Sequence, residues 1–154
     1  MEGLKKYKSI EVLNNHDKQL LEKAIESREH AYAPYSHFRV GASVLLEGGT
    51  IVTGNNQENA VYPSGLCAER VAVFAANANY PGKKIKAIAI SCRNTKRKTA
   101  IPFTSCGSCR QVMLEYELKQ EEPISVLFYG EDGEVWKVPN TKVLLPLYFD
   151  KSAL

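Results

Sequence analysis

The sequence lacks any long hydrophobic run, and no stretch approaches the roughly 18 apolar residues that a membrane-spanning helix needs. Its opening segment, MEGLKKYKSI, carries lysines but no apolar core behind them, so it is not a secretory signal. We therefore expect a cytoplasmic protein that does not act at a membrane.

A strong excess of charge of one sign is also missing. The 154 residues carry 20 basic and 17 acidic side chains, which gives a net charge of only +3. A nucleic-acid-binding domain usually shows a clustered basic excess. Here there is one short basic segment, RNTKRKT at 93–99, which we interpret as a solvated loop. This balance predicts a small or weakly charged partner and no nucleic acid.

Cysteine and histidine are scarce, with four and three residues. Thiols stay reduced in the cytosol, so a few cysteines there indicate metal binding or catalysis before disulfides. None of the three histidines has a second metal-binding residue at ligand spacing, and we expect surface roles for His16, His30 and His37. With no internal repeat, we expect one domain over 1–154, with 1–23 as an N-terminal extension.

Hydrophobic periodicity predicts a mixed succession of elements. Residues 14–33 should form a helix capped by Asp17 and ended by Pro34–Ser36. Gly48 and Gly49 should turn a hairpin. The predicted strands are 38–46, 50–56, 84–92, 123–130 and 134–138, and the two further helices are 66–78 and 106–118.

This order predicts a single three-layer α/β/α domain with a mixed sheet of about five strands and helices on its faces. The strand–helix–strand–helix–strand run in the middle of the chain predicts neighbouring parallel strands joined by right-handed crossovers.

Cysteines stand in the first turn of both predicted later helices. Cys106 and Cys109 are three positions apart and can face one metal ion. The crossover can bring Cys67 to the same point. Helix N-termini favour the thiolate, which is the form that binds metal. Zinc suits sulfur ligands, and a zinc with three protein ligands keeps a position for water.

Glu69 and Arg70 follow Cys67 closely. The spacing of Glu69 makes it a poor ligand but lets it reach a water on the metal as general base and acid. Arg70 lies on the face of Cys67. Three thiolates on Zn²⁺ leave a charge of −1, which Arg70 and the two helix N-termini can offset.

Other interpretations of these residues remain open. A C-x-x-C pair also occurs in redox proteins, and Cys92 could complete a structural zinc site as a fourth ligand. Glu69 and Arg70 could be a solvated helix start. A redox motif does not explain Cys67 or Glu69, and Cys92 ends a predicted strand ahead of a long loop.

The motifs CAER (67–70) and SCGSC (105–109) resemble those of the small, homotetrameric, zinc-dependent cytidine deaminases. The resemblance extends to YAPYSHFRVGA, NQENAVYPSGLCAER, CRQV and LLPLYF, and covers roughly residues 24–149. One departure is Ser105, where the family usually has proline before the first cysteine of the pair. Because proline fixes φ, its absence concerns the rigidity of the loop.

The resemblance implies a cytidine deaminase-like fold, one Zn²⁺ per subunit and a nucleoside substrate. Asn56 and Glu58 would hold the ribose hydroxyls, Phe38 would pack on the base and Ala60 would offer its backbone to the base. Phe149 would reach a neighbouring subunit, so that active sites are shared within a homotetramer.

The predicted reaction is hydrolytic deamination of cytidine and deoxycytidine in pyrimidine salvage. Glu69 would take a proton from the water and give it to N3. It would then pass a proton to the departing amino group. Deamination of another cytosine-like compound or of a polynucleotide is an alternative, as is a zinc-stabilised interaction module without turnover.

Overall fold

The computed structural model describes residues 3–98 and 101–154. Its helices are α1 (Asn15–Arg28), α2 (Ala68–Asn79) and α3 (Gly107–Gln120). The strands are β1 (Lys5–Tyr7), β2 (Phe38–Leu46), β3 (Ile51–Asn55), β4 (Ile85–Asn94), β5 (Ser125–Tyr129) and β6 (Val135–Val138). Short 3-10 turns occur at Ile10–Val12, Tyr62–Ser64, Lys142–Leu144 and Lys151–Ala153.

All of these strands belong to one mixed sheet with the order β1-β6-β5-β4-β2-β3. The predicted α/β class with a mixed sheet is confirmed, but the sheet described has six strands because Lys5–Tyr7 pairs with β6. Parallel pairing links β4 to β5. The prediction that the strands before and after α2 are neighbours is wrong, since β2 lies between β3 and β4.

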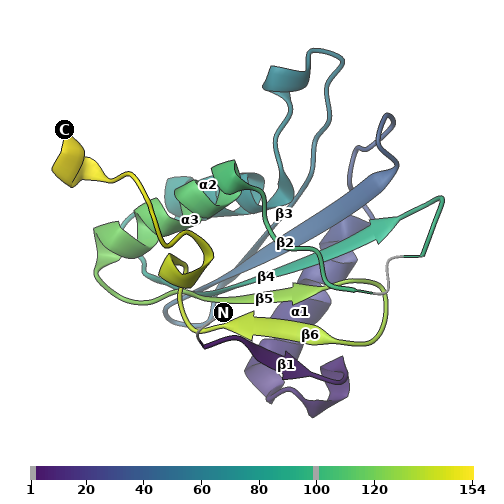
Figure 1. Ribbon diagram of the computed structural model, residues 1–154, viewed down its shortest axis with the longest axis horizontal. Coiled ribbons are helices and arrows are strands. Elements are labelled where there is room, and N and C mark those ends of the chain that lie inside the picture. Colours follow the sequence, from purple (N-terminus) through teal and green to yellow (C-terminus); the bar gives the residue numbers. More distant parts are fainter. Residues whose placement is uncertain (1–2, 99–100) are drawn as a thin grey trace.

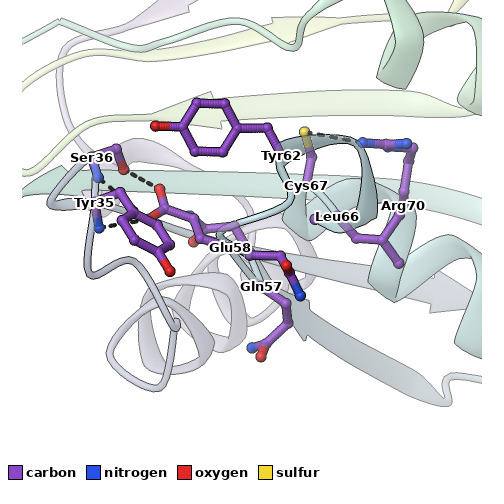
Figure 2. Close-up of a pocket in the computed structure, with 11 residues that line it drawn as sticks. Tyr35, Ser36, Gln57, Glu58, Tyr62, Leu66, Cys67 and Arg70 are labelled. Carbon is purple, nitrogen blue, oxygen red and sulfur yellow. Dashed lines mark hydrogen bonds between the residues drawn. The ribbon is translucent and has the colours of Figure 1, made fainter.

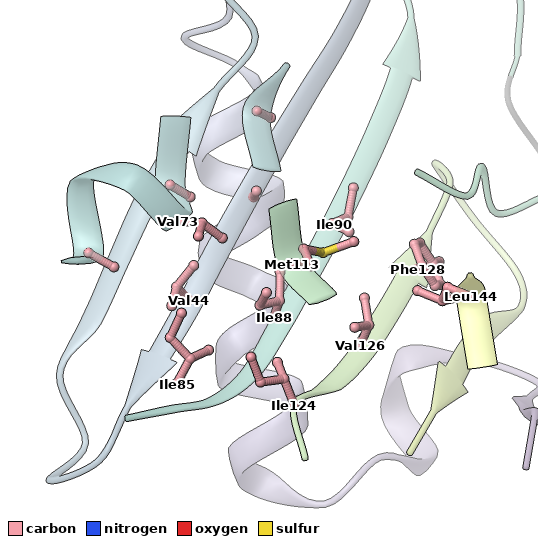
Figure 3. Close-up of a cluster of buried hydrophobic side chains, with 14 of the residues drawn as sticks. Val44, Val73, Ile85, Ile88, Ile90, Met113, Ile124, Val126, Phe128 and Leu144 are labelled. Carbon is pink, nitrogen blue, oxygen red and sulfur yellow. The ribbon is translucent and has the colours of Figure 1, made fainter. Parts of the chain in front are cut away.

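Helices cover both faces of the sheet, with α1 on one face and α2 and α3 on the other (Figure 1). Leu20 and Leu21 of α1 pack with Leu127 of β5 in one buried cluster. The larger cluster joins α2 and α3 to the opposite face (Figure 3) and includes Val73, Met113, Ile88, Val126 and Phe128.

Close contact between α2 and β3 depends on a glycine. A Cβ atom added to Gly54 would stand 2.5 Å from the backbone nitrogen of Ala72. Any side chain there would push α2 away from the sheet. Since α2 begins at Ala68, this contact also fixes the height of the first turn of the helix above the sheet.

The start of α1 corrects the predicted cap. Asn14 is the N-cap, and its side chain accepts a hydrogen bond from the Asp17 backbone at 2.9 Å. The Asp17 carboxylate instead accepts a hydrogen bond from Lys137 of β6 at 2.5 Å. The helix ends at Arg28, before Pro34, because the next backbone N–H groups bond three residues back in a tightened turn.

The helices α2 and α3 lie side by side, and each follows a strand that runs in the same direction (Figure 1). Parallel strands end at the same edge of a sheet, so the connections after β3 and β4 bring both helix N-termini to that edge. The segment between β3 and α2 projects beyond the sheet there.

Candidate active site

Two helix N-termini meet at one end of the sheet, and each has a cysteine as its N-cap. Cys67 caps α2 with φ −72° and ψ 152°, and Cys106 caps α3 with φ −67° and ψ 165°. Cys109 follows in the first turn of α3. The sulfur atoms of the three residues all lie within 4.8 Å of one another.

Hydrogen bonding makes the thiols of Cys67 and Cys109 unequal. The hydrogen bond from Cys109 lowers the pKa of Cys67 to about 6, and Arg70 contributes in the same direction. The same hydrogen bond, together with burial, raises the pKa of the Cys109 thiol. These contacts therefore favour the thiolate form at Cys67 over that at Cys109.

Glu69 and Arg70 take different positions around the sulfurs. The Glu69 side chain is 5% exposed and lines a cavity together with Cys67 and Cys106. The Arg70 guanidinium donates to the Cys67 sulfur at 3.7 Å. Its Nε is buried without a hydrogen-bond partner among the described residues. A carboxylate and a cation thus flank the same thiolate from the first turn of α2.

The sulfur cluster suits a zinc ion. Zinc–sulfur bonds of about 2.3 Å in a tetrahedral site place sulfurs about 3.8 Å apart, which is compatible with three sulfurs that all lie within 4.8 Å of one another. Within residues 3–98 and 101–154, no histidine, carboxylate or fourth cysteine joins this group. Cys92 lies apart and donates to the Tyr129 carbonyl at 3.6 Å. Three protein ligands leave a position for another molecule, as in catalytic zinc sites.

Two adjoining cavities open beside the cluster. The larger, of about 520 Å³, runs from Cys67 and Arg70 to Tyr35, Ser36 and Glu58. In Figure 2, Cys67 and Arg70 lie at one end of the group, Ser36 and Glu58 lie at the other, and the Tyr62 ring lies between them.

The smaller cavity, of about 280 Å³, is lined by apolar residues that include Phe38, Ile90 and Phe103, and by polar residues that include Glu69 and Cys106. The Phe38 and Phe103 rings meet edge to face, with centroids 5.0 Å apart. A flat aromatic base can pack against such a wall.

Asn56 and Glu58 line both cavities. Asn56 accepts from the Val40 N–H at 2.8 Å and donates to the Phe38 carbonyl at 2.9 Å, which fixes its amide against β2. One N–H and one oxygen lone pair of this amide remain for a ligand.

The Glu58 carboxylate accepts a hydrogen bond from the Tyr35 N–H at 2.9 Å, from the Ser36 N–H at 3.3 Å and from the Ser36 hydroxyl. Burial alone would raise the pKa of Glu58, but these hydrogen bonds outweigh it and lower the pKa. The site therefore holds a carboxylate that is ionised at neutral pH and oriented by the segment before β2.

Two predicted site residues lie away from these cavities. Ala60 is exposed on the projecting segment and lines neither cavity. Phe149 is 59% exposed, and its carbonyl accepts from Gln111 of α3 at 2.9 Å. Within this chain, the structure brings together the cysteines, Glu69, Arg70, Phe38, Asn56 and Glu58, and does not bring Ala60 or Phe149 to them.

Sequence reasoning missed several wall residues, notably Tyr35, Ser36 and Phe103. Tyr35 and Ser36 were assigned only to a helix-ending turn. Phe103 lies in a connection with no periodic pattern. An aromatic residue two positions before the SCGSC motif was the available signal for Phe103.

The sequence matches the family described as the cytidine and deoxycytidylate deaminase zinc-binding region over residues 14–121. It is 48% identical over 101 residues to a cytidine deaminase of Halalkalibacterium halodurans, which covers 64% of this chain and 71% of the relative. It is 39% identical over 139 residues to a probable cytidine deaminase of Dictyostelium discoideum, covering 87% and 86% of the two chains.

The fold is similar to the crystal structure of cytidine deaminase from Burkholderia pseudomallei. The TM-score is 0.75 at 38% sequence identity, and the match covers 89% of this chain and 100% of the other. The similarity therefore extends beyond the metal-binding motifs to nearly the whole fold.

Proposed function

The chain belongs to the cytidine and deoxycytidylate deaminase family, and we propose that it hydrolyses cytidine and deoxycytidine to uridine and deoxyuridine with release of ammonia. The observation that carries this proposal is a three-sulfur cluster with a buried carboxylate beside it. Both line a cavity that also has aromatic walls. This reaction would return cytidine to the uridine pool, which is a step of pyrimidine salvage.

The metal is zinc, and we assign Cys67, Cys106 and Cys109 as its ligands. When bound, zinc acts as a Lewis acid that makes water acidic enough to serve as a nucleophile near neutral pH. Glu69 then takes the proton that this water loses, because its carboxylate is buried beside the cluster and is not needed as a ligand.

Glu69 also completes the reaction. It delivers the proton to ring nitrogen N3 as the water oxygen adds to C4. It then takes the proton of the new C4 hydroxyl and passes it to the amino group, which leaves as ammonia while the C4 carbonyl forms. One water is consumed and one ammonia is released, so Glu69 ends each turnover in its starting protonation state.

Arg70 acts on the charge of the cluster. Three thiolates and Zn²⁺ sum to −1, which would raise the pKa of the bound water and oppose catalysis. The Arg70 guanidinium, 3.7 Å from the Cys67 sulfur, withdraws part of that charge. The partial positive charges of the α2 and α3 N-termini act in the same direction.

We assign the nucleoside-binding roles to the walls of the cavities. Phe38, paired with Phe103, would pack on the base. The free N–H of Asn56 and the remaining lone pair of Glu58 would bind the ribose hydroxyls. The ionised Glu58 carboxylate would repel a substrate phosphate, so a nucleoside fits this wall better than a nucleotide.

Assembly into a homotetramer with shared active sites is part of the proposal. Tyr62 is 76% exposed, Leu147 is 94% exposed and Phe149 is 59% exposed. Exposed apolar residues of this size, on two projecting segments, are typical of protein–protein contacts. Ala60 and Phe149 would then act in a neighbouring subunit's site. Sedimentation equilibrium should give four times the chain mass, and a monomer would contradict this part.

We further propose that residues 1–154 act as one domain in the cytoplasm, where thiols remain reduced for metal binding. Within the described residues, no helix combines the length and apolar character that crossing a bilayer requires.

The test is a zinc count and an absorbance assay on one sample. We expect one zinc per chain and loss of cytidine absorbance, with deoxycytidine also consumed and deoxycytidine monophosphate consumed far more slowly. Turnover only of other cytosine compounds or of single-stranded DNA would replace the proposed substrate. Stoichiometric zinc with no turnover of any of them would indicate a metal-stabilised interaction module.

A further inference from the structure

Arg110, the residue after Cys109, holds the turn that carries Cys106. Its Nε donates to the Ser105 carbonyl at 2.8 Å, and one terminal nitrogen donates to the Thr104 hydroxyl at 3.0 Å. The other terminal nitrogen donates to the Leu144 carbonyl at 3.0 Å. One planar guanidinium therefore joins two consecutive residues before the cysteine to a distant segment of the chain.

The backbone of Arg110 completes the restraint. Its N–H donates to the Cys106 carbonyl at 3.0 Å, while its side chain binds the Ser105 carbonyl. These two carbonyls belong to the peptide groups on either side of the Cys106 Cα. The two peptide planes set the direction of the Cys106 Cα–Cβ bond, so Arg110 fixes the direction in which this side chain leaves the backbone.

The guanidinium is itself anchored in the core. Leu144 is 2% exposed and belongs to the larger hydrophobic cluster, next to Phe128 (Figure 3). Its carbonyl is therefore a rigid acceptor. Arg110 transmits this rigidity to an otherwise irregular connection, in which Thr104 is exposed.

The neighbouring residue explains why such a restraint is needed. Ser105 occupies the position before the first cysteine of the pair, where a proline would fix φ covalently. Serine leaves this backbone freer, and its buried hydroxyl has no hydrogen-bond partner among the described residues. The turn must therefore obtain its order from other contacts.

We propose that Arg110 is a positioning residue that holds the Cys106 sulfur ready for zinc by clamping the Thr104–Cys106 turn to Leu144. This inference rests on the proposed role of Cys106 as a zinc ligand. Loss of contacts that orient a ligand typically weakens metal affinity or activity by about 10–100-fold. Geometry carries the effect, since lysine keeps the charge but cannot reach three acceptors in different directions.

The experiment measures zinc release into an excess of a chromogenic chelator. The wild-type protein must first contain one zinc per chain; if it does not, the proposed function fails before this inference is tested. For Arg110→Lys we expect release about 10–100-fold faster than for the wild type. The matched control is Arg39→Lys, because Arg39 also donates to a backbone carbonyl, that of Glu29 at 2.9 Å, on the α1 side of the sheet.

A second variant keeps the test decisive if Arg110→Lys folds poorly. Thr104→Val removes one acceptor and preserves the side-chain shape, so release should quicken by a smaller factor. In the double variant with Arg110→Lys, the Thr104→Val change should add little, because both act on one contact. Unchanged release in Thr104→Val and Arg110→Lys, or equal acceleration in Arg39→Lys, would overturn the inference.

Discussion

The starts of α2 and α3 have similar backbone conformations but carry different side chains. Their N-cap cysteines differ by 5° in φ and 13° in ψ, from −72° and 152° at Cys67 to −67° and 165° at Cys106. The start of α2 carries one sulfur, a carboxylate and a guanidinium, whereas the start of α3 carries two sulfurs and no acidic residue. In the proposed function, the α2 start supplies one zinc ligand together with Glu69 and Arg70, and the α3 start supplies the other two ligands.

The residue before each N-cap is fixed in a different way. Leu66 exchanges two backbone hydrogen bonds with Gln57, at 2.9 and 3.0 Å, which ties the start of α2 to the wall that carries Asn56 and Glu58. Ser105 is held by the Arg110 side chain, which ties the start of α3 to the core. Substitutions that break the contacts of Leu66 should therefore affect substrate binding and turnover. Substitutions that break the contacts of Ser105 should affect metal retention.

The largest effect should come from removing a zinc ligand at either helix start, because both starts are needed to hold the metal. Cys67→Ser and Cys106→Ser each remove one ligand, and a two-sulfur remainder binds zinc far more weakly. We expect both variants to lose zinc and to lose turnover by more than about 10⁴-fold. The double variant should be no worse, because the cluster works as a unit.

Metal analysis and steady-state rates on the same samples check this expectation. Cys92→Ala is the control, since Cys92 is buried outside the cluster and should keep a full complement of zinc. Retention of zinc by either serine variant would remove that cysteine from the ligand set.

Glu69→Gln should separate the two helix starts. The amide preserves the shape of the buried side chain but cannot accept and return the proton. We expect kcat to fall by about 10²–10⁴-fold while zinc stays at one per chain. Inductively coupled plasma analysis and cytidine kinetics give the two numbers. Glu115→Gln on the exposed face of α3 is the control, and wild-type turnover in Glu69→Gln would exclude the assigned role.

The residues that form these two helix starts could be predicted from the sequence. Cysteines at helix starts, the three-residue spacing of Cys106 and Cys109, and a glutamate near Cys67 are short-range patterns. Helices α2 and α3 and the β2–β3 hairpin follow the predicted ranges closely, because each is encoded by its own periodicity, whereas α1 ends five residues before the predicted end at residue 33.

Features that depend on residues far away in the chain could not be predicted from the sequence. Strand β1 is the short triplet Lys5–Tyr7, two lysines and a tyrosine without alternation, and forms because β6 offers an unpaired edge. The insertion of β2 between β3 and β4 is a property of the whole sheet. Arg110 carries no signal in its own neighbourhood that points to Leu144, 34 positions away. Likewise, the contact of Asp17 with Lys137 of β6, 120 positions away, has no local signal.

Gln57→Pro should sharpen the contrast at the α2 start. Proline removes the N–H that donates to the Leu66 carbonyl, and a lost backbone hydrogen bond costs about 1 kcal/mol. We expect KM for cytidine to rise about 5–10-fold with little change in zinc release, since Cys106 and Cys109 keep their restraint. Gln57→Ala keeps the N–H and should behave as the wild type. Faster zinc release without a change in KM would reverse the roles given to the two helix starts.

The smallest effect should come from Ser105→Pro, which adds at the α3 start a second restraint of another kind. Arg110 binds the carbonyl of residue 105, and proline keeps that carbonyl, so the two restraints are compatible. Proline also removes a buried hydroxyl that lacks a partner among the described residues. We expect the free energy of unfolding to rise by about 0.4–1 kcal/mol, with turnover unchanged.

Combining Ser105→Pro with Arg110→Lys tests whether the two restraints do the same work. If the arginine compensates for the missing proline, Ser105→Pro should slow zinc release more in the Arg110→Lys background than in the wild type. Chelator kinetics on the four proteins of this cycle, with Ser105→Ala to isolate the loss of the hydroxyl, measure the coupling. Equal changes in both backgrounds would mean that the proline and the arginine order different parts of the turn.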